Sequence, residues 1–300
     1  MKIYLPKTKR PVGWRIFIQE GLEDHPKTTL VDSYEQADFV IIGLFSVADK
    51  QVLENPNKLI VIDYRDRLSG LLHPQMCYLY FKRRILDDAR TKVVLDNVIP
   101  IAYPVKREYL IARPANVFSP RPIDVACFFN LSYPRNLHWN ENRARVANFI
   151  SKSVAADSSV RAHIGEIGKA GNLGRNRLQP SYHEALLGSK IVITCNPKNW
   201  EGDHRLFEAM ISGALVFVDR MQTPMKNPLL DKVHLVYYDL ENLDQLLSDV
   251  MFYLEHDAER HRIAQQGFEF VQKHHTYLNR IDEILEAIDV KKRQNDLDMV

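Results

Sequence analysis

The stretch WEGDHRLFEAMISGALVFVDRM, from Trp200 to Met221, contains the clearest structural pattern of this sequence. Its first part has apolar residues spaced as on one face of a helix, namely Leu206, Phe207, Met210 and Ile211. Ser212 and Gly213 then predict the end of that helix. The apolar run Ala214–Val218 that follows predicts a strand covered on both faces, as in a parallel sheet flanked by helices.

Charged residues gather at the start of this predicted helix. Asp203, His204 and Arg205 stand at its N-terminal end, and Glu208 lies one turn further on. A helix N-terminus offers unpaired N–H groups and the positive end of a dipole, and arginine adds a planar pair of donors, so we expect a phosphate here. A carboxylate one turn further on suits the two hydroxyls of a ribose. The group predicts a nucleoside diphosphate site; the alternative is an ordinary ion pair on a helix surface.

This part of the chain resembles the donor-binding half of GT-B glycosyltransferases. The resemblance is carried by the segment SKIVITCNP, a loop, and then RLFEAMISGALVFVD. The likeness is to the group that includes exostosin-like and spore-coat CgeB-like enzymes, in which the signature R-x-[FY]-E-A-x-x-x-G-[AC] recurs. It extends over roughly Ile123–Asp219. The resemblance implies an α/β fold of two Rossmann-like domains with parallel sheets facing a cleft. It also implies that Arg205 contacts the donor pyrophosphate and Glu208 the donor ribose.

One feature departs from this resemblance. Many retaining GT-B enzymes carry two glutamates separated by seven residues, whereas here Glu201 precedes Glu208 with six residues between them. The role of Glu201 as a sugar contact therefore stays open. So does the question of whether the anomeric configuration of the sugar is retained or inverted.

The length and charge of the chain set further bounds. Its 300 residues are enough for two domains that each bury a core. We expect an acceptor-side domain over residues 1–118, completed by C-terminal helices at about 275–290 that cross back to it, and a donor-binding domain over 119–274. A proline-rich segment, Pro114–Pro122, is the expected linker. The net charge of +2 gives no support for nucleic-acid binding.

Cysteine usage and hydropathy suggest a compartment. Cys77, Cys127 and Cys195 lie far apart and match neither a disulfide framework nor a zinc pattern. No apolar run approaches the roughly 20 residues that span a bilayer, and KIYL is too short for a signal peptide. We expect a cytoplasmic protein with buried thiols. The basic residues Lys273–His275 predict either a solvated face or peripheral membrane contact.

The first half alternates predicted strands with short helices, which favours a parallel α/β sheet. Strands are expected at Lys2–Leu5, Thr29–Val31, Ala37–Leu44 and Lys58–Asp63, with a helix over Ile16–Leu22. The run that begins at Met76 fits a strand or a helix. Ligands of such sheets bind at the carboxyl ends of the strands.

Acceptor-side candidates lie at those strand ends. Asp63 and Asp66, in the cluster DYRDR, are candidate bases for an acceptor hydroxyl. Asp63 closes a strand, so Asp66 is favoured by exposure; the alternative is a loop of mutually paired charges. Gly13, Trp14 and Arg15 follow the first strand and are candidates for an acceptor wall, because sugars stack on aromatic faces; core packing is the alternative for the tryptophan.

Further donor-site candidates follow strands of the second domain, in regions that lie beside the diphosphate and nucleobase in the resembling families. They are Asn130, Ser132 and Arg135 after the strand Ile123–Phe129, and Asn196 and Lys198 after the strand Lys190–Thr194. Tyr182 lies on a short helix between these strands, and Ser181 is expected to cap that helix.

The resemblance implies glycosyl transfer from a UDP- or GDP-linked sugar to a hydroxyl of a glycan or glycoconjugate, by a hexosyl- or pentosyltransferase. Fixed cations and helix N–H groups stabilise a leaving diphosphate, and no D-x-D motif stands in a metal-placing context, so we expect no metal and no further cofactor. Two alternatives stay open. A nucleotide-sugar epimerase would act on the donor alone, and a non-catalytic protein would bind the nucleotide sugar unchanged.

Overall fold

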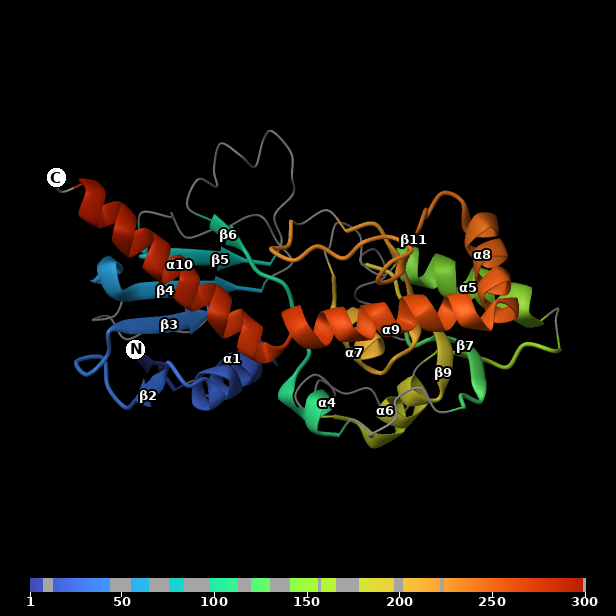
Figure 1. Ribbon diagram of the computed structural model, residues 1–300, viewed down its shortest axis with the longest axis horizontal. Coiled ribbons are helices and arrows are strands. Elements are labelled where there is room, and N and C mark those ends of the chain that lie inside the picture. Colours follow the sequence, from blue (N-terminus) through green and yellow to red (C-terminus); the bar gives the residue numbers. More distant parts are fainter. Residues whose placement is uncertain are drawn as a thin grey trace. The chain divides into compact units, whose positions relative to one another are not determined.

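The computed structural model describes residues 1–7, 13–43, 55–64, 76–83, 98–112, 120–129, 141–155, 158–165, 178–196, 202–221 and 224–298. The chain divides into two compact units (Figure 1). Unit 1 comprises Met1–Pro104, Gln222–Lys226 and Thr276–Val300, and unit 2 comprises Val105–Met221 and Asn227–His275. The units change over at Pro104–Val105. Residues 113–119, in which most of the expected linker falls, lie outside the described residues.

Unit 1 is built on a six-stranded sheet in the order β2-β1-β3-β4-β5-β6, with every pair parallel. The strands are β1 (Lys2–Tyr4), β2 (Thr29–Val31), β3 (Phe39–Gly43), β4 (Leu59–Asp63), β5 (Leu79–Lys82) and β6 (Val98–Pro100). Every residue of β3 and β4 is buried, as expected for uninterrupted apolar runs in a parallel sheet. The run after Met76 forms a strand, which resolves the alternative left open by its periodicity.

Two helices of unit 1 pack on each other, α1 (Gly13–Asp24) and α10 (Tyr277–Asp298). A Cβ on Gly21 would meet Ile281 Cγ1 at 2.6 Å, so the glycine allows the two helices to approach closely. α10 continues to Asp298. Its polar end consists largely of residues with good helix propensity, and Lys291 anchors it by donating to the Tyr78 carbonyl at 2.6 Å.

Unit 2 is built on a five-stranded parallel sheet in the order β11-β10-β9-β7-β8. The strands are β7 (Ile123–Cys127), β8 (Ala162–Ile164), β9 (Ser189–Ile193), β10 (Leu215–Asp219) and β11 (Val236–Tyr238). β10 is buried at every residue, as the run Ala214–Val218 predicted. The core of unit 2 includes Val125, Ile193 and Phe217, which contact buried residues of the surrounding helices.

The helices of unit 2 are α4 (Arg107–Ile111), α5 (Glu141–Ala155), α6 (Pro180–Leu187), α7 (His204–Ile211), α8 (Leu243–Glu255) and α9 (Asp257–His274). α9 packs against α7 and β10, and Figure 1 shows it running beside α7. A Cβ on Gly267 of α9 would lie 2.1 Å from the His234 carbonyl oxygen. Only glycine allows this close approach, which explains a glycine inside a long helix.

Two helix ends test the local sequence signals. α7 ends at Ile211, and Gly213 then adopts a left-handed φ of 77°, so the predicted stop at Ser212 and Gly213 is confirmed. The expected cap of α6 by Ser181 is wrong: the helix begins at Pro180, after Gln179. Proline at the first helical position is preset to a helical φ and needs no N–H partner there, which moves the start of the helix ahead of the serine.

Both sheets are wholly parallel, so each has a carboxyl edge at which loops and helix N-termini gather. The α/β fold with two Rossmann-like sheets is confirmed. In unit 2 that edge carries the residues after β9, the start of α7 and the end of β10.

Candidate functional site

The N-terminus of α7 is capped by Asp203. Its Oδ1 accepts hydrogen bonds from the backbone N–H of Arg205 at 2.7 Å and of Leu206 at 3.3 Å. Aspartate is a favoured cap because its side chain satisfies amides that lack partners within the helix. Two of the N–H groups that the sequence offered to a phosphate are therefore already bonded. A phosphate at this end of α7 would meet side-chain donors in place of these two amides.

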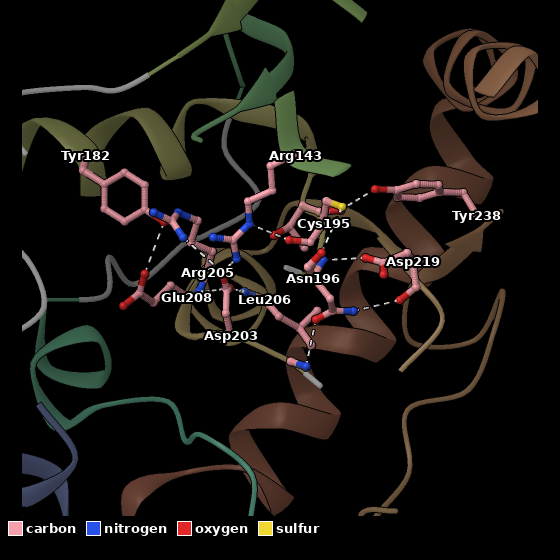
Figure 2. Close-up of polar contacts among 12 residues, drawn as sticks. Arg143, Tyr182, Cys195, Asn196, Asp203, Arg205, Leu206, Glu208, Asp219 and Tyr238 are labelled. Carbon is pink, nitrogen blue, oxygen red and sulfur yellow. Dashed lines mark hydrogen bonds and ion pairs between the residues drawn. The ribbon is translucent and has the colours of Figure 1, made fainter. Parts of the chain in front are cut away.

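Two arginines converge on the second oxygen of Asp203 (Figure 2). Arg205 Nη1 lies 3.0 Å from Oδ2, and Arg143 Nη2 forms a short ion pair with the same atom. Burial alone would raise the pKa of Asp203, but the two guanidinium groups outweigh it and lower that pKa. Asp203 is therefore an ionised anchor for both arginines. The Arg205 side chain remains 29% exposed.

Arg143 is a site residue that the sequence interpretation missed. It lies near the start of α5, is 7% exposed, and donates from Nε to the Cys195 carbonyl at 2.8 Å. The sequence did contain a signal for a buried arginine at this position. Arg143 lies at helical spacing from Val146, Ala147 and Ile150, which form the buried stripe of α5. An arginine on a buried helix face needs a partner inside the protein.

Glu208 lies one turn into α7 and is 6% exposed. Its Oε2 accepts from the Tyr182 hydroxyl of α6 at 3.2 Å, and its Oε1 accepts from Lys106 Nζ at 3.2 Å. Burial, followed by the charge of Glu208, raises the pKa of Tyr182 well above its ordinary value. The Tyr182 ring packs edge-on against Phe128, with the ring centroids 5.3 Å apart. Tyr182 and Glu208, both sequence candidates, are thus brought together, whereas Lys106 was missed.

Asn196 follows β9 and contacts residues of two neighbouring segments. Its backbone N–H donates to Asp219 Oδ1 at 2.6 Å, and its side-chain oxygen accepts from Gly202 N–H at 2.8 Å. Asp219 ends β10, and burial raises its pKa to about 6 although the hydrogen bonds from Asn196 oppose the change. Figure 2 shows this network beside the Asp203 group. Asn196 therefore links the end of β9 to the end of β10 and to Gly202 ahead of α7.

The remaining donor-site candidates are less fully described. His204 is the first residue of α7, next to the Asp203 cap. Four candidates lie outside the described residues, namely Asn130, Ser132, Arg135 and Lys198. Glu201 lies outside them as well.

The acceptor-side candidates lie in unit 1. Asp63 ends β4 and is 1% exposed; its Oδ2 accepts from the Tyr80 hydroxyl at 2.7 Å and lies 3.3 Å from Lys82 Nζ. Arg15 donates to the carbonyls of Pro6 at 2.6 Å and Leu5 at 3.2 Å, and so holds the end of the segment after β1. Gly13 and Trp14 begin α1. Asp66 lies outside the described residues.

Comparison with known proteins fits this geometry. Residues 139–286 match a family model described as "Glycosyl transferase-like", a segment that contains α5, α6, α7 and β10. The whole architecture also matches that of solved GT-B glycosyltransferases. The chain has the GT-B fold of these glycosyltransferases.

Three solved structures illustrate this likeness of fold. Anabaena Alr3699/HepE in complex with UDP aligns with a TM-score of 0.56 and 9% identity, over 96% of this chain and 99% of that one. An alpha-glucosyltransferase in complex with UDP and a 13-mer DNA containing a HMU base aligns with a TM-score of 0.55 and 10% identity, over 96% and 98%. TarM aligns with a TM-score of 0.50 and 12% identity, over 79% of this chain and 56% of that one. At these identities the likeness shows the fold.

A further comparison and two structural features gave negative results. No curated protein matches the sequence. Among the helices in the described part of the chain, none combines the length and apolar character that crossing a membrane requires. Within the same part of the chain, no three His, Cys, Asp or Glu side chains are grouped so as to hold a metal ion.

Proposed function

We propose that this protein transfers a hexosyl or pentosyl group from a UDP- or GDP-linked sugar to a hydroxyl of a glycan or glycoconjugate, without a metal ion. The observation that supports this most is the pairing of Arg205 and Glu208 one turn apart on α7, at the carboxyl edge of the sheet of unit 2. Both side chains are oriented by neighbours, Arg205 by Asp203 and Glu208 by Tyr182 and Lys106. A guanidinium beside a carboxylate matches a diphosphate joined to a ribose.

Arg205 and Glu208 have different roles in this proposal. The guanidinium of Arg205 binds the donor diphosphate and stabilises the charge that develops on it as the glycosidic bond breaks. The two carboxylate oxygens of Glu208 accept hydrogen bonds from the ribose hydroxyls, in exchange for or in addition to Tyr182 and Lys106. The leaving-group charge is thus met by fixed protein cations, which is why we propose a reaction that is independent of metal.

A general base on the acceptor side completes the proposal. Of the two sequence candidates we propose Asp66 as the base, because Asp63 is fully buried and already bonded to Tyr80 and Lys82. A base must reach the proton that it removes, and the carboxylate of Asp63 is occupied by two donors. We propose Gly13, Trp14 and Arg15 as part of the acceptor side.

A binding experiment tests the donor site. Thermal unfolding is followed with UDP, GDP, ADP and dTDP, each with magnesium and with a chelator. A ligand at one hundred times its dissociation constant stabilises the native state by about 2.7 kcal/mol. We expect UDP or GDP to raise the melting temperature without metal, and R205A and E208A to reduce the increase. The matched controls are R145A on the exposed part of α5 and E184A on α6, which leave the increase unchanged.

A turnover experiment separates the enzyme classes. Release of nucleoside diphosphate from a sugar nucleotide is measured with and without a panel of glycans, and the sugar nucleotide is checked for epimerisation. Acceptor-dependent release supports transfer, whereas a changed sugar without acceptor would identify an epimerase. Binding with no change to the donor under any acceptor would identify a binding protein. If no nucleoside diphosphate stabilises the wild type, the proposed function is wrong.

A further inference from the structure

The Arg143–Asp203–Arg205 group holds more positive than negative charge. Two guanidinium groups share one carboxylate, which leaves the three side chains with a net charge of +1. The adjacent Lys106–Glu208 pair is neutral as a pair. Without Arg143, Asp203 and Arg205 would form a neutral pair at the start of α7. The surplus charge of this part of the site therefore depends on Arg143.

Arg143 stays charged in this environment. Burial lowers its pKa to about 10, the charge of Arg205 acts in the same direction, and Asp203 opposes both. A group with that pKa is protonated at neutral pH. The guanidinium also joins two parts of the site, because Nε binds the carbonyl of Cys195 after β9 while Nη2 binds the cap of α7. The planar fork of arginine makes both contacts at once, which a lysine cannot reproduce.

The different exposures of the Arg143 and Arg205 side chains suggest that the two residues have different roles. The Arg143 side chain is 8% exposed and bonded through Nε and Nη2, whereas the Arg205 side chain is 29% exposed. Arg205 is thus the member of the pair with surface left for a ligand. Both arginines share the Asp203 carboxylate. Because Arg143 compensates part of the negative charge of Asp203, that carboxylate cancels less of the positive charge of Arg205.

We infer that Arg143 is a positioning residue of the donor site: it compensates Asp203, so that the charge of Arg205 remains available to the diphosphate of a nucleotide sugar. This inference rests on the proposed function and adds a second arginine, from a different helix, to the binding of the donor. It assigns to Asp203 the orientation of Arg205. Arg143 acts through Asp203 and does not contact the donor.

The test compares ligands with and without phosphate charge. The affinities of UDP with uridine, and of GDP with guanosine, are measured by calorimetry for the wild type and for R143Q. We expect R143Q to weaken diphosphate binding by about tenfold, the equivalent of about 1.4 kcal/mol, and to leave nucleoside binding within about twofold. The loss should shrink at high salt, since screening weakens a charge effect. A merely structural role would weaken the diphosphate and the nucleoside alike.

Three further variants sharpen the test. R145Q removes an arginine from the same helix at an exposed position, where it bonds the Leu240 carbonyl and Glu241, and should change neither affinity. R143K keeps the charge without the fork and should recover part of the loss. The double variant R143Q/D203N returns the group to a net charge of +1 from Arg205 alone, and we expect it to bind the diphosphate about threefold or more tightly than R143Q.

The outcomes separate the inference from the proposed function. If the wild type binds no nucleoside diphosphate, both are wrong. If the wild type binds one and R143Q binds it within about twofold as well, only the inference is overturned. Should R143Q fail to fold, R143K and the double variant carry the comparison. Equal losses of diphosphate and nucleoside affinity in R143K, or a double variant that binds nucleoside but no diphosphate, then overturn the inference.

Discussion

Lys106, the residue before α4, donates from Nζ to Oε1 of Glu208 on α7 at 3.2 Å, and both side chains are buried. The pair joins a segment that follows the change from unit 1 to unit 2 with the helix that carries Arg205. Tyr182 occupies the other oxygen of Glu208. A buried carboxylate with one cation and one hydroxyl on it is compensated and oriented, which is the state that a ribose-binding carboxylate needs before its ligand arrives.

Removing Lys106 should destabilise the protein strongly. In K106M the carboxylate of Glu208 stays buried without the lysine that pairs with it, and leaving one member of a buried ion pair uncompensated costs about 3 kcal/mol or more. Urea unfolding of K106M measures this loss. The control is K226M, which breaks an exposed pair with Glu286 and should cost less than about 1 kcal/mol. Similar small losses for both variants would show that Lys106 does not compensate Glu208.

Arg121 should be as important for unit 2, for a different reason. Its guanidinium donates to the carbonyls of Leu186 at 3.2 Å, Ser189 at 2.6 Å and Ser212 at 2.5 Å. It therefore joins the C-terminal ends of α6 and α7, where helix carbonyls run out of regular N–H partners, to the first residue of β9.

In R121M these three carbonyls lose a charged donor, and we expect a loss of about 3 kcal/mol or more in the free energy of unfolding. R262M is the control, since Arg262 is exposed on α9 and paired with Glu259. It should lose less than about 1 kcal/mol. Equal transition midpoints of the two variants in urea would contradict the role given to Arg121.

The sequence predicted much of this unit because its signals are local. The apolar spacing of Leu206 to Ile211 and the Ser212–Gly213 stop describe α7 within its own residues, and a buried apolar run describes β10. The mismatch at Ser181 also has a local cause, a proline one position earlier. Fold class and the Arg205–Glu208 pair were therefore within reach of pattern reasoning.

The partners of Arg205 and Glu208 could not be predicted from the sequence, because they come from distant segments. Lys106 is separated from Glu208 by most of unit 2 and stands in no periodic pattern. Arg143 had a signal in its place on the apolar stripe of α5, but its partner Asp203 is known only once the fold brings α5 to the start of α7. Asp203 itself looked like a ligand contact, whereas its geometry is that of a cap. Short motifs locate a site, and tertiary packing selects its supporting residues.

Asp219 should give the protein a measurable pH dependence. Its pKa is raised from 3.8 to about 6, chiefly by burial. A carboxyl whose pKa is higher in the folded state binds more protons when folded, so its contribution to stability is greatest below about pH 4 and is lost as the pH rises to about 6. At about 1.4 kcal/mol for each pKa unit, the loss is about 2–3 kcal/mol.

The measurement is the free energy of unfolding of the wild type relative to D219N from about pH 3 to about pH 7. We expect the difference to fall through the window from about pH 4 to about pH 6. Asp124 provides a control of opposite sign. Burial acts to raise its pKa, but hydrogen bonds from Arg161 and Lys190 outweigh this and lower it to about 2. The wild type should therefore lose stability relative to D124N as the pH drops below about 4. A difference from D219N that does not vary with pH would contradict the shift at Asp219.

The last prediction concerns the ribose. If Glu208 accepts hydrogen bonds from both ribose hydroxyls, a ligand that lacks the 2′-hydroxyl leaves one carboxylate oxygen without its ligand partner. Sites built to bind a hydroxyl discriminate against analogues that lack it, because the buried polar group is then left unpaired. Here Tyr182 and Lys106 remain as partial substitutes, so the discrimination should be modest.

We expect the wild type to bind UDP about tenfold more tightly than 2′-deoxy-UDP, or GDP more tightly than 2′-deoxy-GDP. E208A should bring the two affinities within about twofold of each other, because the acceptor that tells them apart is gone. E184A, which removes an exposed glutamate from α6, should keep the wild-type ratio. R205A should weaken both nucleotides together and also keep the ratio, since the diphosphate is common to both ligands. A ratio that survives in E208A would place the ribose elsewhere, and would leave Glu208 as an internal partner of Lys106 and Tyr182.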